Sequence, residues 1–179
     1  RALKHNDAGA GAVISGHEAT LTWPESEIAL PVTGARAVPQ SWTDYNDHMN
    51  ETHYLEVGSN ATDRFMEMIG ADAAYIAGGL SFFTAENHIR YLDEVNAGDT
   101  LTVTTQVLAG AGKKLHLFQF MHRSDGTLAA TMETLLLHVN LMTRRTEEPP
   151  QTVADAIADY VAQHAAIPWP EGAGRVGRR

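Results

Sequence analysis

The sequence predicts an α+β fold in which one long helix packs on an antiparallel sheet and a second helix follows near the C-terminus. Three observations support this prediction. Apolar and small residues recur every three or four positions over residues 51–69, which is helical spacing. Extended segments then alternate with turn-forming Asn, Asp and Gly, as in an antiparallel meander. The 179 residues, 44% of them hydrophobic, suffice for one compact domain.

The first element that we expect is a strand over residues 27–38. Its apolar stretch is interrupted at Pro31 and followed by Pro39, and proline is tolerated at the ends and edges of strands. A polar and aromatic loop over residues 41–50 follows, rich in turn-forming residues. Residues 1–27, which precede the strand, show no sustained period and indicate a lead-in segment or a fusion junction.

The long helix is expected over residues 51–69, directly after this loop. Its apolar or small residues share one face: Tyr54, Gly58, Ala61, Phe65, Met68 and Ile69. Gly70 supplies the stop signal. Because Gly58 and Ala61 are small, this face of the helix can lie close against a sheet.

Four successive strands are expected over residues 80–95, 99–109, 113–123 and 127–142. Turn chemistry separates each strand from the next. A sheet of this kind has unpaired edges, and pairing with a second copy of the chain is the usual remedy. We therefore expect a homo-oligomer, either a dimer or a dimer of dimers.

The C-terminal part, residues 147–179, is expected to hold one helix and a tail. After two consecutive prolines, Thr152 can cap a helix over residues 153–165. The Pro- and Gly-rich residues 168–174 are expected to form a loose tail unless a partner orders them. Residues 28–146 are then expected to form the folded domain.

Composition argues against several partners and sites. The net charge of -9 opposes binding to nucleic acid or to an anionic membrane. The chain has no cysteine, which excludes disulfides, thiolate metal sites and a Cys nucleophile. No segment approaches the roughly 20 apolar residues that cross a bilayer, and the first residues carry no apolar signal region. We therefore expect a cytoplasmic protein.

The densest cluster of reactive side chains lies in residues 44–50, immediately before the long helix. The N–H groups at the start of a helix have no partner within the helix and can hold an anion. The backbone amides of Asn50, Glu51 and Thr52 are therefore expected to stabilise a developing oxyanion.

Within this cluster, Asp44 is the expected catalytic carboxylate. It could attack a carbonyl carbon or activate a water molecule, with Asn46 and His48 orienting the water or the carboxylate. These residue types are also common in turns and helix caps, so a purely structural role stays open. A metal site built from Asp44, Asp47, His48 and His53 is not expected, because their spacing matches neither a His-Glu-x-x-His helix nor an EF-hand loop.

The pattern Asp-x-Asn-x-His-Met-Asn before a helix resembles the signature of the 4-hydroxybenzoyl-CoA and acyl-ACP thioesterase branches of the hot-dog superfamily. The resemblance covers roughly residues 30–145 and implies a hot-dog fold, in which an antiparallel sheet wraps a long helix. It also implies catalytic roles for Asp44, Asn46 and His48. Asp47 stands where the bacterial branch has glycine, a position suited to positive φ, which Asp tolerates better than most residues.

A closer likeness runs through residues 83–99 and 114–118, which resemble the betainyl-CoA thioesterases of bacterial carnitine breakdown. Some of these enzymes are fused behind a carnitine dehydrogenase, and Arg1–Val13 resembles the fusion junction. The resemblance implies hydrolysis of a short acyl-CoA, betainyl-CoA, to betaine and CoA. It implies no cofactor.

A trimethylammonium acyl group needs aromatic ring faces, each of which attracts a cation by on the order of 0.5–2 kcal/mol. Trp42, Tyr45, Tyr54 and Phe83 lie in or near the motif segments and are the expected substrate-binding residues. Packing in the core is the alternative, and it is stronger for Tyr54; Trp42 and Tyr45 are the better candidates for the cation. Glu86 is the expected second catalytic carboxylate, with a structural role as its alternative.

Four basic residues could meet the phosphates of CoA or could form an ordinary charged rim: Arg90, Lys113, Lys114 and Arg123. Two other functions stay open. One is a non-catalytic hot-dog module that binds an acyl thioester or a small cation, or that dimerises a fused dehydrogenase. The other is a hydratase or lyase of the same fold. Release of free thiol separates the thioesterase from both.

Overall fold

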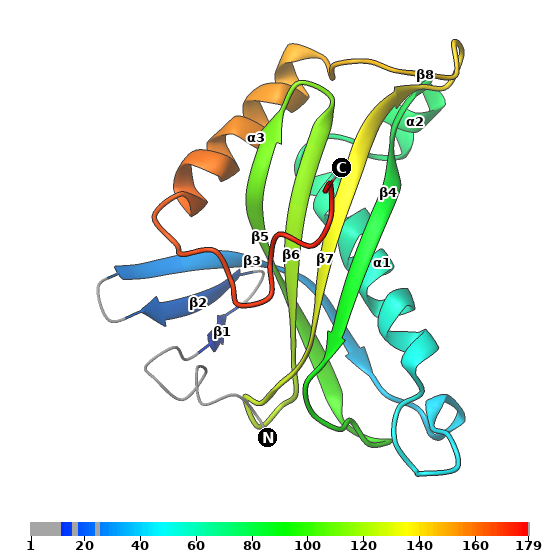
Figure 1. Cartoon of the computed structure of the whole chain (residues 1–179), viewed down its shortest axis with the longest axis vertical. Coiled ribbons are helices and arrows are strands. Elements are labelled where there is room, and N and C mark those ends of the chain that lie inside the picture. Colours follow the sequence, from blue (N-terminus) through cyan, green and yellow to red (C-terminus); the bar gives the residue numbers. More distant parts are fainter. Residues whose placement is uncertain (1–11, 16–17, 24–25, 179) are drawn as a thin grey trace. The chain divides into compact units, whose positions relative to one another are not determined.

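The computed structural model describes residues 12–15, 18–23 and 26–178 and confirms the α+β class with a C-terminal helix (Figure 1). The expected fusion junction at Arg1–Val13 falls mostly outside the described residues. The strands are β1 (Ala12–Ser15), β2 (Glu18–Trp23), β3 (Ser26–Ala37), β4 (Leu80–Tyr91), β5 (Thr100–Ala111), β6 (Lys114–His122), β7 (Leu128–Asn140) and β8 (Arg145–Thr146). The helices are α1 (Glu51–Met68), α2 (Ala73–Ala77), α3 (Gln151–His164) and a 3-10 turn over Gln40–Trp42.

The strands form one sheet in the order β1-β2-β3-β5-β6-β7-β4, and β8 pairs with β7. β4 therefore stands at one end of this order. The chain divides into two compact units, and each contributes to the candidate functional residues. The first unit is Arg1–Thr62, Ile89–Thr105 and Gln119–Met132; the second unit is Asp63–His88, Gln106–Phe118 and Glu133–Arg179.

In the first unit, small residues let the beginning of α1 pack closely on the sheet. A Cβ atom at Gly58 would stand 2.6 Å from Met132 Sδ, so glycine makes room for that side chain. Gln119, fully buried, donates from Nε2 to the Gly58 carbonyl at 3.1 Å and to Thr62 Oγ1 at 2.9 Å. Ala61, also fully buried, continues the same face. This is the close approach that the small residues predicted.

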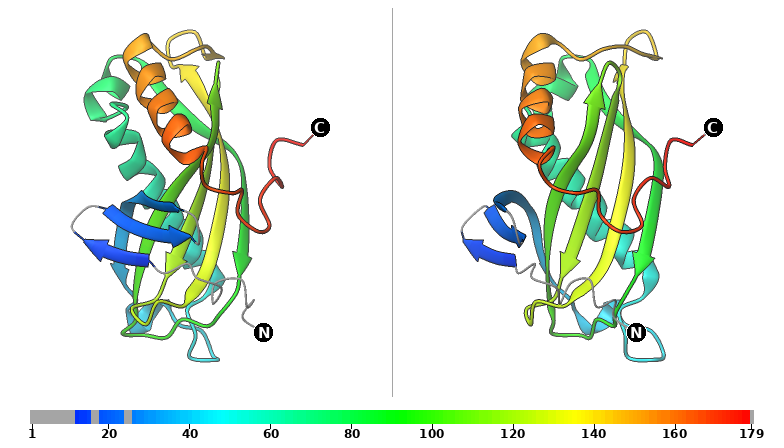
Figure 2. Two further views of the ribbon diagram at one scale, coloured as in Figure 1. Left: turned by 90° about the vertical axis from the view of Figure 1, so that its left-hand side faces the viewer. Right: turned by 60° about the vertical axis from the view of Figure 1, so that its left-hand side comes forward.

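In the second unit, α3 packs through Val153 and Ile157, both almost fully buried. Gly110 on β5 permits this contact, because a Cβ atom there would overlap the Ile157 side chain. After α3 the chain turns back and runs across β6 and β7 (Figures 1 and 2). The C-terminal segment, residues 169–178, thereby packs on the strands within the second unit.

At the end of α3, His164 is buried without charge. Its Nδ1 accepts the Val107 N–H at 2.9 Å, so this nitrogen carries no proton. Burial lowers the pKa of His164 from 6.5 to about 4. Because the unfolded chain binds this proton more readily, stability should fall as the pH decreases from 6.5 toward 4. At about 1.4 kcal/mol per pH unit, we expect the loss in free energy of unfolding to be at most about 3 kcal/mol.

The expected loss is measured by urea unfolding at a series of pH values across this window. His164→Gln is the matched variant, because its amide oxygen can still accept from Val107 but does not titrate. We expect a flatter pH dependence in His164→Gln than in the original chain. His122, whose pKa burial also lowers to about 4, should contribute to the dependence that remains. Equal slopes in both proteins would contradict the assignment to His164.

The predicted elements are present with shifted ends. The helix predicted over residues 51–69 is α1, and the four strands predicted over 80–95, 99–109, 113–123 and 127–142 are β4 to β7. The strand predicted over residues 27–38 is β3, which pairs with β2 on one side and β5 on the other.

Several elements differ from the prediction. The short β1 and β2 in the lead-in segment, and α2 after the long helix, were not predicted. The cap predicted at Thr152 is wrong, because α3 begins after Pro150 and has no side-chain cap. The loose tail predicted over residues 168–174 is also wrong, since the buried Glu133 accepts the Gly174 N–H at 2.7 Å. A distant carboxylate, invisible in local composition, orders this segment.

Candidate active site

The loop before α1 is a tight turn closed by backbone hydrogen bonds. Thr43 and Met49 form an antiparallel bridge, and the Asp44 N–H donates to the His48 carbonyl at 3.0 Å. The Asp47 N–H donates back to the Asp44 carbonyl at 3.0 Å. Asp47 has φ of 61°, the left-handed region that glycine favours. Asp therefore adopts the conformation expected at this position.

The Asp44 carboxylate is held in place by its own loop. Its Oδ1 accepts the Asn46 N–H at 2.8 Å, and the residue is half-buried. This hydrogen bond engages one of the two carboxylate oxygens and limits rotation of the side chain. The Asn46 residue is exposed, and the contact to Asp44 comes from its backbone. The loop thus presents a carboxylate with a defined orientation.

The start of α1 uses two of the three amides that were expected to bind an oxyanion. The Asn50 N–H donates to the Trp42 carbonyl at 2.8 Å. Asn50 Oδ1 caps the helix by accepting the Thr52 N–H at 3.1 Å and the Thr52 hydroxyl at 2.9 Å. Of the three, the amide of Glu51 is left as the candidate donor. The helix that follows is 18 residues long, so its dipole adds positive potential at this end.

His48 contacts a residue that the sequence did not single out. Its Nε2 lies 3.1 Å from Glu94 Oε2, and both side chains are partly exposed. The two segments are joined by a bridge between His48 and Asn96 and by a hydrogen bond from the Met49 N–H to the Val95 carbonyl at 2.7 Å. Glu94 follows β4 as an ordinary acidic residue. No sequence pattern marks it, because the pairing depends on how two distant segments meet.

The aromatic candidates differ in what their rings contact. Trp42 is buried, stacks on His53 at 4.5 Å and 7°, and lies under the Arg36 guanidinium at 4.7 Å. Tyr54 is 4% exposed and meets Tyr91 edge to face at 5.1 Å. Burial raises the pKa of Tyr54 to about 12, so its hydroxyl stays protonated. Both rings are therefore engaged by neighbouring protein groups.

Tyr45 presents the opposite case, because 95% of the residue is exposed. It lies directly beside Asp44 in the loop. Of the four aromatic residues expected to bind substrate, Tyr45 is the one that the first unit offers to a ligand with the least competition from neighbouring protein groups.

Glu86 and Phe83 belong to the second unit, on β4. Glu86 Oε2 accepts the Gly177 N–H at 2.6 Å, so this carboxylate holds the C-terminal segment. Phe83 is 51% exposed. The expected second carboxylate thus has a structural contact in this conformation, and the motif residues of the first unit form the candidate site.

Arg123 is one of the residues expected to meet CoA phosphates, but it is engaged within the protein. Its guanidinium lies 3.0 Å from Asp125 Oδ2 and 3.3 Å from Asp93 Oδ1. The hydrogen bond from Arg123 holds the pKa of Asp125 far below its ordinary value. Arg123 therefore stabilises the turn between β6 and β7, and its guanidinium is occupied by carboxylates of the protein and not available to a phosphate.

The metal alternative gains no support from the described part of the chain, where no group of three or more His, Asp or Glu residues could hold an ion. Of the residues that it named, His53 stacks on Trp42 and its Nδ1 lies 3.4 Å from Glu56 Oε2. Among the described helices, none combines the length and the apolar character needed to cross a bilayer.

Comparison with known proteins identifies relatives for the chain. The family model of the thioesterase-like superfamily matches residues 38–157. An L-carnitine dehydrogenase/betainyl-CoA thioesterase of Ruegeria pomeroyi is 50% identical over all of this chain, which spans 38% of that protein's length. A betainyl-CoA thioesterase of Pseudomonas aeruginosa is 39% identical over 75% of the chain and 86% of its own length.

A solved structure has a similar fold. A Staphylococcus aureus protein characterised in complex with CoA superposes with a TM-score of 0.75 and 30% sequence identity. The match covers 87% of this chain and 97% of that protein.

Proposed function

Because the chain belongs to the thioesterase-like superfamily and has the hot-dog fold, we propose that it is an acyl-CoA thioesterase acting on betainyl-CoA. The reaction consumes one water and yields betaine and CoA. The relatives of Ruegeria pomeroyi and Pseudomonas aeruginosa that carry this activity in their names support the substrate. The orientation of the Asp44 carboxylate supports the chemistry.

The single observation that carries the mechanism is the hydrogen bond from the Asn46 amide to Asp44 Oδ1 at 2.8 Å, in a loop directly before α1. With one oxygen engaged, the other can accept a proton from water. The water oxygen attacks the thioester carbon, the C–S bond breaks, and the CoA thiolate leaves and takes up a proton. Alternatively the free oxygen attacks the thioester carbon directly, the C–S bond breaks with departure of the CoA thiolate, and water hydrolyses the mixed anhydride that forms.

These two routes differ in where the oxygen of the new carboxylate comes from. In the direct-attack route, one oxygen of Asp44 is transferred to the product when water attacks the enzyme carbonyl. A single turnover in water labelled with oxygen-18 therefore tests direct attack followed by hydrolysis at the Asp44 carbonyl, because that product lacks the label in the first turnover and the product of general-base catalysis carries it.

The amide of Glu51 is the proposed oxyanion donor. It opens an 18-residue helix, where the dipole favours negative charge. His48 is proposed as a positioning residue, because its imidazole joins the loop to Glu94. Tyr45 is the proposed contact for the trimethylammonium group, since its exposed ring can present a face to a cation.

The proposed assembly is a homo-oligomer paired through β4. This strand ends the sheet order and carries exposed aromatic residues, Phe83 and Tyr91, at 51% and 52% exposure. An unpaired strand edge favours association with a second copy. Residues 28–146 are proposed as the thioesterase domain, with residues 1–27 as a junction to a carnitine dehydrogenase domain of the kind that the relatives' names include.

The proposal is tested by thiol release from betainyl-CoA and from 3,3-dimethylbutyryl-CoA, which replaces the quaternary nitrogen by carbon and so keeps the shape without the charge. We expect kcat/KM for betainyl-CoA to exceed that for the neutral substrate by about tenfold, the effect of one cation–aromatic contact. Equal kcat/KM values for the two substrates would contradict the assignment of betainyl-CoA as the substrate. Binding without free thiol would instead support a non-catalytic module, and a product formed without free CoA would support a lyase.

A further inference from the structure

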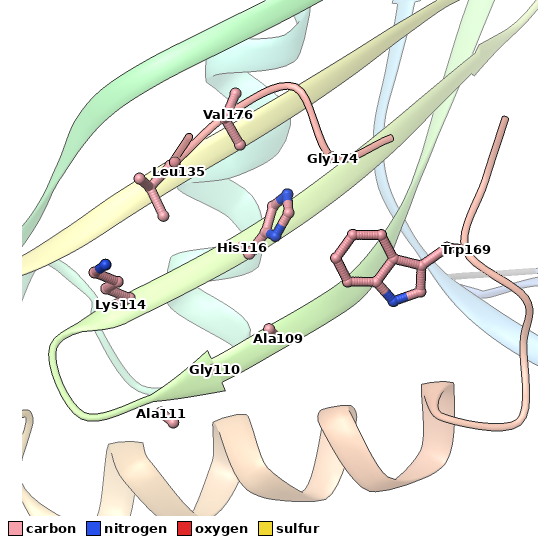
Figure 3. Close-up of a pocket in the computed structure, with 10 residues that line it drawn as sticks. Ala109, Gly110, Ala111, Lys114, His116, Leu135, Trp169, Gly174 and Val176 are labelled. Carbon is pink, nitrogen blue, oxygen red and sulfur yellow. The ribbon is translucent and has the colours of Figure 1, made fainter. Parts of the chain in front are cut away.

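The second unit contains a cavity of about 330 Å³, and no residue of the loop before α1 is among the described residues that line it (Figure 3). Strands β5, β6 and β7 form its floor, and the C-terminal segment, residues 169–178, contributes Trp169, Gly174, Val176 and Gly177 to its lining. Its volume lies at the lower end of the range for small-molecule sites, roughly 300–1,000 Å³. A compact ligand therefore fits it.

The C-terminal segment is held over this floor by two carboxylates. Glu133, 1% exposed, accepts the Gly174 N–H at 2.7 Å and the Arg175 N–H at 3.0 Å. Glu86 accepts the Gly177 N–H at 2.6 Å. The roof of the cavity is thus fixed by backbone contacts at three residues. Burial of an ionised carboxylate is costly in free energy unless the carboxylate accepts hydrogen bonds. Glu133 therefore favours the position in which the C-terminal segment lies over the strands and donates its N–H groups.

Glu133 also sets the chemistry of the cavity wall. His116 donates from Nε2 to Glu133 Oε1 at 2.7 Å, which leaves Nδ1 as the ring nitrogen for a ligand. Burial raises the pKa of Glu133, but hydrogen bonds from the Arg175 amide, from His116 and from the Gly174 amide outweigh it and hold the pKa below its ordinary value. The carboxylate is therefore an ion already occupied by protein donors.

Charged and apolar groups are segregated along the cavity. Figure 3 shows Lys114 toward one end and Trp169 toward the other, with His116 between them. Trp169 meets the edge of His116 at 5.5 Å and 88°. Leu135 and Val176 supply apolar surface on the side of β7. None of the described residues that line the cavity is acidic, and the ionised Glu133 behind its wall is already bonded to protein donors. The ammonium group of Lys114 is therefore the full charge that the lining itself presents to a ligand.

We propose that this cavity binds a small carboxylate with an apolar body, whose anionic group pairs with Lys114 and whose body packs against Leu135, Val176 and Trp169. An ammonium group attracts a carboxylate, and burial of the apolar body supplies the remaining affinity. This site goes beyond the proposed thioesterase activity, because it uses none of the residues that the proposed mechanism names. Lys114, a possible phosphate contact by sequence, lines this cavity instead.

The test is a titration of the full chain with benzoate, followed by NMR. We expect benzoate to shift the indole N–H of Trp169 and the amides of Gly174 and Gly177. In Lys114→Gln the dissociation constant should rise by about fivefold, the effect of one partly exposed ion pair. Lys113→Gln, the matched control, removes the neighbouring charge, which does not line the cavity, and should bind benzoate like the original chain.

Benzamide separates charge from shape, because it has the same ring and no charge. We expect it to bind more weakly than benzoate in the original chain and to bind Lys114→Gln and the original chain alike. Three results would overturn the proposal: no shift at about 10 mM benzoate, the weak limit for a ligand of this size; equal benzoate affinity in Lys114→Gln; or shifts confined to the loop around Asp44. Loss of thioesterase activity in Asp44→Asn has no bearing on these outcomes, so the two proposals fail separately.

Discussion

Replacing Asp44 by Asn should lower kcat for thioester hydrolysis by about 10²–10⁴-fold, the usual contribution of a positioned general base. Asn keeps an oxygen that can accept the Asn46 N–H, so the loop should retain its shape. Its amide group can neither take a proton from water nor attack a thioester. The measurement is thiol release under saturating betainyl-CoA, together with an unfolding curve that verifies the fold.

Asp47→Asn is the matched control. It makes the same chemical change three residues away, at an exposed position with φ of 61° that Asn also tolerates. We expect its kcat to stay within about threefold of the original, as for a surface change with little structural effect. If Asp44→Asn and the original chain hydrolyse betainyl-CoA at equal rates, Asp44 has no part in the chemistry. Equal losses in both variants would point to a general charge effect of the loop.

The second large effect is expected from Gly110→Ala. The new methyl group would overlap the Ile157 side chain, which is 4% exposed and belongs to the packed face of α3. Either α3 shifts outward or Ile157 leaves its rotamer, and overpacking of this kind costs about 1–3 kcal/mol. Urea unfolding followed by circular dichroism measures the loss in free energy of unfolding.

Gly34→Ala gives the matched comparison, since it adds the same methyl group to another strand. Its nearest neighbours would be Ala61 Cβ at 3.6 Å and Val103 Cγ2 at 3.7 Å, which are ordinary contacts. We expect the free energy of unfolding to change by no more than about 0.5 kcal/mol. The methyl group fits beside its neighbours, and alanine has less conformational freedom than glycine in the unfolded chain. If the two variants lose equal stability, the contact between Gly110 and Ile157 does not limit the packing of α3.

The long helix and the strands β4 to β7 could be predicted from the sequence because their signals are local. The predicted meander is confirmed for β5, β6 and β7 but is wrong for β4, which ends the sheet order beside β7 and not beside β5. Helical spacing in residues 51–69 and turn chemistry between the strands both depend on neighbours within a few positions. The conformation of Asp47 followed from comparing its position with a glycine in a known pattern. The position of Asp44 before the start of a helix was also predictable, because the motif and the helical spacing that follows it are both local in the sequence.

Contacts between distant segments could not be predicted. Glu94 meets His48 only because the chain brings residues 46 positions apart in sequence together. Glu133 binds the amides of Gly174 and Arg175, which lie 41 and 42 positions further along the chain. Short elements were missed for another reason, because α2 has five residues and too few turns to show a period.

The hold of Glu133 and Glu86 on the C-terminal segment has an evolutionary consequence. Both carboxylates bind peptide N–H groups, so the side chain at Arg175 is free to drift through mutation without weakening the attachment. At Gly174 and Gly177 the φ angles of 82° and 71° favour glycine, and at Arg175 proline is unsuitable because it has no N–H to donate. Selection to keep this attachment would therefore act on the two glutamates and the two glycines, and against proline at position 175.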